Sequence, residues 1–178
     1  MDVTQFKIHG KTIYLQVIMD NFSRYIINYK ITESIGALST VETIKDAEKK
    51  LNNYYNDRNL MMDGGPENVN RHVEKLLIAK NINRVIAKVD MRFSNSMIES
   101  LFRSMKNNYL YYQKIRSLSK FKMKVKYYVK EHNLNIPHSA FKGATPNEVY
   151  FDKWSIKDEQ ELKDKIANRV KERQKRVF

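Results

Sequence analysis

The 178-residue sequence contains no cysteine, which excludes disulfide bonds and thiolate metal sites and is compatible with a cytoplasmic protein. It also lacks any apolar run near the ~20 residues that a membrane-spanning helix needs, so we expect no membrane partner. Its first residues show neither the basic nor the apolar segment of a secretion signal. Internal repeats and low-complexity linkers are absent as well, and the length suits one domain.

Acidic residues are missing from one long stretch of a chain whose net charge is +13. Residues 103–130 contain nine Lys or Arg and no Asp or Glu, with tyrosines and a phenylalanine interleaved. A solvated charged face is the ordinary explanation of such a run. The length of this stretch instead favours a surface that binds a phosphate backbone. Nucleic acid is therefore a better candidate for the polyanionic partner than a membrane. The residues that we assign to DNA binding are Arg103, Lys106, Lys114, Arg116, Lys120, Lys122 and Lys124.

The segment from Asn95 to Tyr109 has the periodicity of a helix with one apolar side. Glu99, Arg103 and Lys106 line up on a different, polar side at about 100° per residue. Taken alone, this stripe is explained by an ordinary exposed Glu–Arg pair. The apolar side consists of Ile98, Leu101, Phe102, Met105 and Tyr109.

A second acid lies upstream, where a short buried strand over 59–62 ends at Asp63. Gly64 and Gly65 follow it, and we expect them to let the backbone turn away and present the carboxylate at a sheet edge. Between Asp63 and Glu99 lie 35 residues (99 − 63 − 1). A third acid, Asp2, opens a strand-like run over 3–8.

This pattern resembles the catalytic core of the DDE recombinases, the retroviral integrases and insertion-sequence transposases. That family carries Asp-x-Thr on its first strand, an Asp at a turn after a later strand, and a Glu 35 residues further on with a Lys behind it. The matching residues here are Asp2, Asp63, Glu99 and Lys106. The segment Asp20 to Arg24 is similar to the family's Asp-x-x-Ser-Arg. By this similarity Asp20 is a structural acid in a turn and not a metal ligand. Asp20 is also the alternative candidate for the first carboxylate of the site.

Two later motifs extend the resemblance to about residue 151. Residues 132–138 share Asn133, Pro137 and His138 with the family's motif before the end of the core, whereas His132 and Ile136 replace its Tyr and Arg. Residues 143–150 are similar to the family's Gly-x-Thr-Pro-x-Glu. In this segment a Thr N-cap, a Pro at the first position and a Glu at the third form a capping box.

The resemblance implies an α/β, ribonuclease-H-like fold with a mixed five-stranded sheet and flanking helices. We expect residues 1–151 to form the catalytic core, with a truncated first strand, and residues 152–178 to form a charged helical tail. The expected strands are 3–8, 12–19, 25–31, 59–62 and 84–87, and the expected helices 37–55, 67–80, 95–109 and 118–133. Residues 88–94 are expected to form a loop over the active site, with Asp90 as a loop acid.

The implied chemistry is cleavage of a phosphodiester bond and transfer of the DNA strand. Two Mg²⁺ or Mn²⁺ ions about 3.5–4 Å apart stabilise the attacking and leaving oxygens in such reactions. Hard divalent ions prefer oxygen ligands, so three carboxylates suit them. By the resemblance, Asp2 bridges the ions and Asp63 and Glu99 each hold one, while Arg103 and Lys106 hold phosphates.

The partners implied are the DNA of element ends and target, and further copies of the chain. If the source is a bacterium, we expect the protein at the nucleoid. Three interpretations stay open because Asp2 lies nearer the start than the family's first acid does. We expect the chain to be the core of a transposase, as a fragment or split product of a longer protein, or a catalytically inactive DNA-binding remnant, or a stand-alone nuclease.

Overall fold

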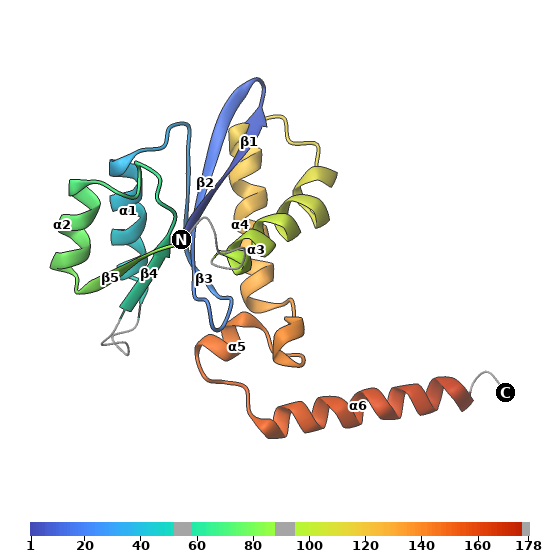
Figure 1. The fold of residues 1–178 in the computed structure, drawn as a ribbon. Coiled ribbons are helices and arrows are strands. Elements are labelled where there is room, and N and C mark those ends of the chain that lie inside the picture. The colour runs from blue at the N-terminus through green and yellow to red at the C-terminus, as the bar shows by residue number, and fades with distance from the viewer. Residues whose placement is uncertain (52–57, 88–94, 176–178) are drawn as a thin grey trace.

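The computed structural model describes residues 1–51, 58–87 and 95–175 of the chain (Figure 1). Five strands come first, interrupted by two helices, and further helices complete the chain. In order, the elements are β1 (Asp2–Ile8), β2 (Lys11–Met19), β3 (Ile26–Thr32), α1 (Ala37–Glu48), β4 (Arg58–Met62), α2 (Arg71–Ala79), β5 (Ile82–Ile86), α3 (Ser96–Asn108), the 3₁₀ turn η1 (Leu110–Tyr112), α4 (Leu118–Leu134), the 3₁₀ turn η2 (Ser139–Phe141), α5 (Pro146–Tyr150) and α6 (Ile156–Lys175).

The first three strands form an antiparallel meander in which each strand pairs with the next. Asp2 lies opposite Val17 in the ladder between β1 and β2. Along β2, Ile13, Leu15 and Val17 are all buried in one core, because side chains two residues apart point to the same face of a sheet. The alternating pattern predicted for this strand is confirmed.

The remaining strands, β4 and β5, form a parallel ladder of their own. The five predicted strands are therefore all present, but their hydrogen bonds form a three-stranded and a two-stranded sheet and not one continuous five-stranded sheet. The two sheets meet where the ammonium group of Met1 donates a 2.6 Å hydrogen bond to the carbonyl of Met61. This contact sets the start of β1 beside the end of β4.

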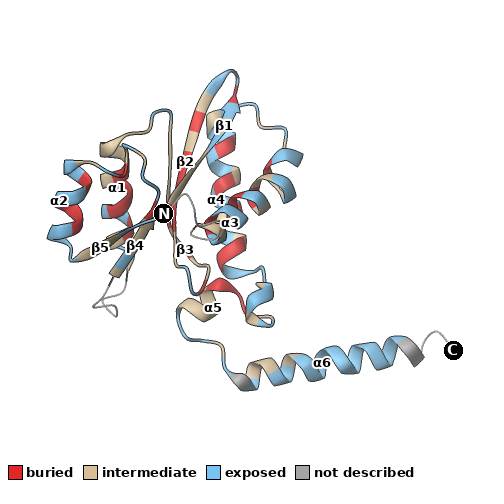
Figure 2. Cartoon of the chain, viewed as in Figure 1, coloured by how far each residue is buried: buried red, intermediate tan, exposed pale blue. Residues whose placement is uncertain are grey.

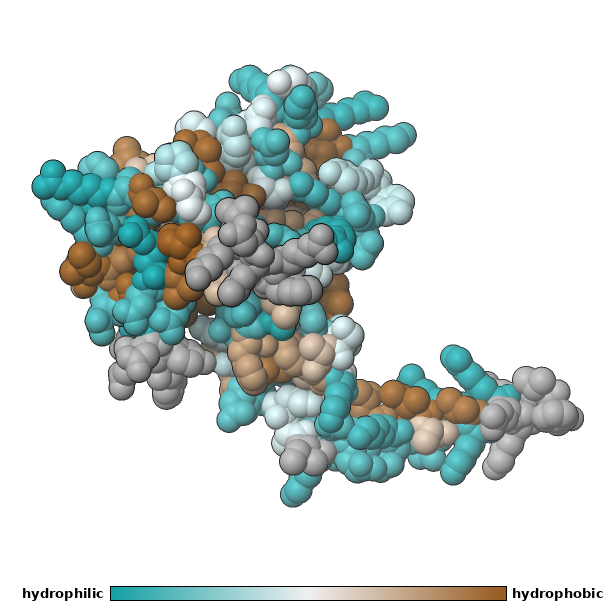
Figure 3. Space-filling model, viewed as in Figure 1, coloured by the Kyte–Doolittle hydropathy of each residue, from teal (hydrophilic) through white to brown (hydrophobic). Residues whose placement is uncertain are grey.

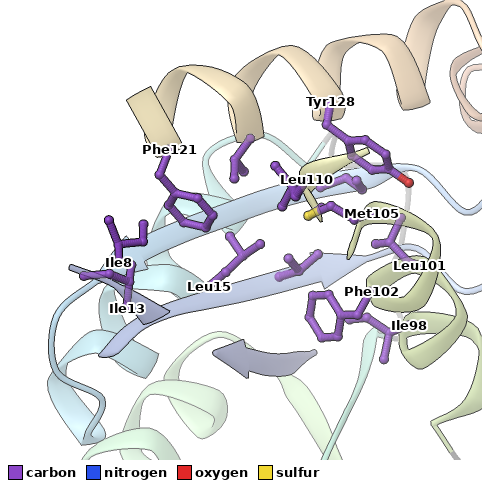
Figure 4. Close-up of a cluster of buried hydrophobic side chains, with 13 residues drawn as sticks. Ile8, Ile13, Leu15, Ile98, Leu101, Phe102, Met105, Leu110, Phe121 and Tyr128 are labelled. Atoms are coloured by element: carbon purple, nitrogen blue, oxygen red, sulfur yellow. The ribbon is translucent and has the colours of Figure 1, made fainter. Parts of the chain in front are cut away.

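Helices lie on both sides of the strands and enclose two hydrophobic cores (Figure 1). The first core joins the meander to α3 and α4, and Figure 4 shows Leu101, Met105 and Phe121 pointing into it. The second core lies toward α1 and α2 and includes Ile44 and Met62. Burial of apolar surface on both faces is the main term that stabilises this layered arrangement.

Buried polar side chains connect β2 to α1. The amide nitrogen of Gln16, a fully buried residue, donates to Thr40 Oγ1 at 3.2 Å, and Thr43 Oγ1 donates to Gln16 Oε1 at 3.0 Å. Thr40, in the first turn of α1, thus faces the sheet. The N-cap is Gly36, whose N–H donates to Ser39 Oγ at 3.1 Å.

Three boundaries of the predicted core strands and helices differ by two residues or more from the structure. Helix α1 ends at Glu48, several residues before the predicted end at 55. Helix α2 begins at Arg71 and not at 67, because the Asn70 side chain accepts hydrogen bonds from His72 N and Val73 N and caps the helix there. Strand β5 begins at Ile82, two residues earlier than predicted.

The predicted capping box at the start of α5 is confirmed. Thr145 Oγ1 accepts a 3.3 Å hydrogen bond from Glu148 N, and Glu148 Oε2 accepts a 2.8 Å bond from Thr145 N. Pro146 occupies the first helical turn, where a missing N–H leaves no bond unmade. Short as it is, α5 therefore has a fixed starting point.

The predicted tail helix is present as α6, which projects from the rest of the chain and is largely exposed (Figures 1 and 2). Apolar atoms follow one side of this helix in Figure 3. Two of its apolar residues, Ile166 and Val170, are exposed. Across residues 1–51, 58–87 and 95–175, no helix combines the length and apolar character that crossing a bilayer requires.

Candidate active site

Asp2 is the first residue of β1 and is held next to β4 through its neighbour Met1. Met1 is 5% exposed, and burial lowers the pKa of its ammonium group to about 6, although the charges of Asp2 and Asp63 act in the opposite direction. The carboxylate of Asp2 is half-buried and accepts a 2.7 Å hydrogen bond from Val3 N. The pairing of β1 with β2 and the contact of Met1 with Met61 together fix the position of Asp2 in the fold.

Asp63 follows the last residue of β4, as predicted, and is exposed at the end of the strand. Its Oδ1 atom accepts hydrogen bonds from Gly65 N at 3.1 Å and from Asn68 Nδ2 at 2.5 Å. Neither Gly64 nor Gly65 has a positive φ. The expected reason for the turn was therefore wrong: the Asp63 side chain holds it, and the conformational freedom of glycine is not needed.

Glu99 lies in the first turn of α3, a helix with the predicted apolar and polar sides. Glu99 and Arg103 are exposed. Lys106 is half-buried, with Nζ 5.1 Å from the centre of the Phe6 ring, and burial lowers the pKa of its ammonium group. The buried side of the helix consists of Ile98, Leu101, Phe102 and Met105.

Asp63 and Glu99 are both close enough to Asp2 for their charges to act on its carboxyl group. Burial is the main cause that raises the pKa of Asp2, and the negative charges of Asp63 and Glu99 raise it further, against a hydrogen bond from Val3 N that lowers it. In residues 1–51, 58–87 and 95–175, no three His, Cys, Asp or Glu side chains are grouped tightly enough to hold a metal ion. Joint coordination by these acids stays a prediction.

The predicted cationic surface extends from α3 across η1 to α4, and most of it is exposed. Lys124 is an exception, because it is half-buried with Nζ 5.9 Å from the Tyr109 ring. The interleaved aromatic residues divide between core and surface: Phe121 is fully buried, whereas Tyr111 and Tyr112 are 66% and 79% exposed. The exposed cations among the predicted set are Arg103, Lys114, Arg116, Lys120 and Lys122.

Asp20, the rival for the first carboxylate, has the structural role that the sequence predicted. Its Oδ2 atom accepts hydrogen bonds from Ser23 N at 2.7 Å and Ser23 Oγ at 2.6 Å, and so closes the turn between β2 and β3. Asp90 and the rest of the predicted active-site loop, 88–94, lie outside the described residues.

Two residues of the 132–138 motif also have structural contacts. Asn133 exchanges two hydrogen bonds with the backbone of Ile26, accepting from its N at 2.9 Å and donating to its carbonyl at 3.0 Å. His138 Nδ1 accepts from Ala140 N at 3.2 Å. These contacts tie the end of α4 to β3 and shape the turn that follows.

The sequence did not point to Asn68, whose side chain contacts Asp63. An Asn shortly after a turn is ordinarily an exposed residue. Its burial here, to 1% exposure, depends on how the segment between β4 and α2 packs against the rest of the chain. No local pattern in the sequence reports such packing.

Comparison with known proteins places this chain within a family. Two family models, both described as integrase core domain, match residues 1–89 and 82–146. The putative transposase InsK for insertion sequence element IS150, from Escherichia coli (strain K12), is 26% identical over 147 residues. That match covers 83% of this chain and 52% of the relative, so the chain spans about half the length of this curated protein.

Solved structures of integrase cores have the same fold. The catalytic core domain of BIV integrase superposes with a TM-score of 0.64 at 17% identity, covering 85% of this chain and 93% of its own. The HTLV-2 integrase catalytic core, solved with magnesium in a dimeric form, gives a TM-score of 0.59 at 16% identity, covering 84% and 90%. These likenesses confirm the ribonuclease-H-like α/β class. By its family-model matches, the chain belongs to the integrase core domain family.

Proposed function

We propose that this chain is the catalytic domain of a DDE transposase or integrase, which cleaves DNA and joins the cut end to a target. One observation carries the proposal. The carboxylates of Asp63 and Glu99, from the end of β4 and the start of α3, both raise the pKa of Asp2 on β1. Two acids from separate elements thus act on a third through their charge, in a chain of the integrase core domain family.

The acids fit a site for Mg²⁺ or Mn²⁺. Their donors are all carboxylate oxygens, the ligands that these ions prefer. Carboxylates that repel one another, as the effect on Asp2 indicates, are also stabilised by a divalent cation. Asp2, Asp63 and Glu99 would hold two such ions, which stabilise negative charge on attacking and leaving oxygens when bound.

The remaining residues of the site would bind and orient the DNA. In the cleavage step the oxygen of water bonds to phosphorus and the bond to the 3′ oxygen breaks, which leaves a 3′-hydroxyl. In the transfer step that hydroxyl loses its proton, attacks a phosphorus of the target strand, and displaces the target's own 3′ oxygen. Arg103, exposed one turn beyond Glu99, and Lys106, one turn further, would hold phosphates near the bond that breaks.

Binding of DNA and self-association belong to the same proposal. The exposed cations between Arg103 and Lys122 supply a charge suited to a phosphate backbone. The core of HTLV-2 integrase has been solved as a dimer, and by likeness we propose that this chain also works as an oligomer on paired DNA ends.

The test is a Mn²⁺-dependent nicking and strand-joining assay on plasmid and oligonucleotide DNA. We expect Asp63→Asn and Glu99→Gln each to abolish turnover without loss of folded protein. Glu74→Gln is the matched control, because Glu74 is likewise an exposed glutamate in the first turn of a helix, α2, away from the three acids. It should keep the activity of the wild type.

Each product pattern decides between the interpretations. Joined products that vanish in both acid variants support a transposase or integrase. Cut but unjoined products that vanish in the same variants would indicate a nuclease. A wild-type chain that binds DNA but neither cuts nor joins it would be an inactive remnant, and full activity in either acid variant would refute the assigned site.

A further inference from the structure

The carboxylate of Asp63 is held at one of its two oxygens. Gly65 N and Asn68 Nδ2 both donate to Oδ1, at 3.1 and 2.5 Å. The backbone donor comes with the turn, whereas the Asn68 amide reaches back across five residues from a buried position. With two donors on one oxygen, the carboxylate has a defined orientation. Among residues 1–51, 58–87 and 95–175 no hydrogen bond to its Oδ2 atom is found, so that this atom is left for another ligand.

Asn68 makes this contact at a cost to the fold. The residue is 1% exposed, and within the described part of the chain its Oδ1 atom has no hydrogen-bond partner. A buried amide oxygen without a partner is unfavourable. Turning the amide over would not help, because Oδ1 would then face the Asp63 carboxylate, and two acceptors repel. The carboxylate therefore dictates the orientation of the amide.

Asn133 shows what a structural asparagine looks like in the same protein. It is also buried, at 6% exposure, but both polar atoms of its amide are bonded to the backbone of Ile26. Asn133 thus satisfies its own groups while joining α4 to β3. In Asn68, by contrast, the amide nitrogen donates to the carboxylate of Asp63, and the amide oxygen has no hydrogen-bond partner among the described residues.

We propose that Asn68 is a positioning residue, which fixes the Asp63 carboxylate so that Oδ2 is presented to a divalent metal ion. This inference rests on the proposed function. A neighbour that holds a metal-binding carboxylate in place raises metal affinity by restricting the orientations that the ligand samples. The partly unsatisfied amide is then retained for the site and not for the stability of the fold.

The test compares Asn68→Leu and Asn68→Ala with Asn133→Leu, using Mn²⁺ alone as the probe. Titration calorimetry gives the Mn²⁺ affinity, and thermal unfolding without metal gives the stability. For both Asn68 variants we expect Mn²⁺ affinity to fall about 10- to 100-fold. For Asn68→Leu we expect the unfolding temperature to stay or rise, because an apolar group replaces an unpaired amide. Asn133→Leu should do the reverse: the unfolding temperature falls and Mn²⁺ affinity is kept.

Asp63→Asn separates failure of this inference from failure of the proposed function. If wild-type protein binds no Mn²⁺, or Asp63→Asn binds it unchanged, the metal site itself is wrong and the role of Asn68 falls with it. If Asp63→Asn weakens binding while both Asn68 variants keep the wild-type affinity, the site stands and the positioning role is refuted. Ala leaves more room than Leu, so loss of affinity in both variants excludes overpacking as its cause.

Discussion

Individual acids in this chain have different roles that their surroundings set. Asp20 accepts two hydrogen bonds from Ser23 at its Oδ2 atom and closes a turn. Asp2 is half-buried, and the negative charges of two further carboxylates act on it. Such an environment disfavours the ionised form of a carboxyl group, and it is typical of sites that bind a cation. Spacing and motif predicted different roles for these two acids, and the hydrogen bonds of Asp20 agree with its predicted role in a turn. The contact of Asn68 with Asp63 was not predictable, because it depends on tertiary packing.

At the residue scale, the buried amino group of Met1 predicts a pH dependence of stability. Its pKa is about 6 in the folded chain against 8.0 in the unfolded one, so between these values the unfolded state binds more protons. The free energy of unfolding must therefore rise from pH 6 to pH 8, by as much as about 3 kcal/mol. Urea unfolding at a series of pH values measures this slope.

Acetylation of the amino terminus is the control for this prediction. It removes the titrating group, so the slope between pH 7 and pH 8 should vanish. Burial also lowers the pKa values of His132 and His138 from 6.5, which adds a slope of the same sign, but below that range. An unchanged slope in the acetylated protein would show that the Met1 amine does not titrate as described.

At the scale of elements, the sequence predicted where strands and helices lie and was least accurate about their ends. Strand β2 and helix α3 carry strong apolar periodicity, and both were found as predicted. Helix α2 begins late because Asn70 caps it, although Glu67 and Asn68 continue the polar pattern upstream. The division of the strands into two sheets was not predictable, since the periodicity of one strand does not say which other strand it pairs with.

The capping box of α5 gives a prediction at this scale. Thr145→Ala removes the acceptor for Glu148 N and one donor to the Glu148 carboxylate. It should lower the free energy of unfolding by about 1 kcal/mol. Thr145→Ser keeps the hydroxyl and should lose less than half of that. Equal losses in the two variants, measured by urea unfolding, would assign the effect to the methyl group and not to the cap.

At the scale of the whole molecule, charge is distributed unevenly over the fold. Helices α1 and α2 lie on one side of the strands, and α3 and α4, with the acid-free stretch, lie on the other (Figure 1). Phosphate contacts release counterions, so DNA affinity should fall steeply as salt is added. If the α3–α4 side binds DNA, only cations on that side should contribute to the salt dependence.

Two pairs of charge reversals test this asymmetry. Lys120→Glu with Lys122→Glu changes exposed lysines of α4, and Lys45→Glu with Lys75→Glu changes exposed lysines of α1 and α2. Each pair by itself lowers the net charge from +13 to +9 (13 − 4). The α4 pair should weaken DNA binding at least about tenfold and reduce the salt slope by about 2. The other pair should leave the slope nearly unchanged, and equal effects would mean that only net charge matters.

Anomalous scattering from crystals grown with Mn²⁺ measures whether Asp2, Asp63 and Glu99 together hold divalent ions. We predict anomalous peaks at about 2 Å from carboxylate oxygens of all three residues. The peaks should be absent from crystals of Asp63→Asn grown in the same way. If manganese is bound elsewhere and none lies between these three carboxylates, the three residues do not form the metal site.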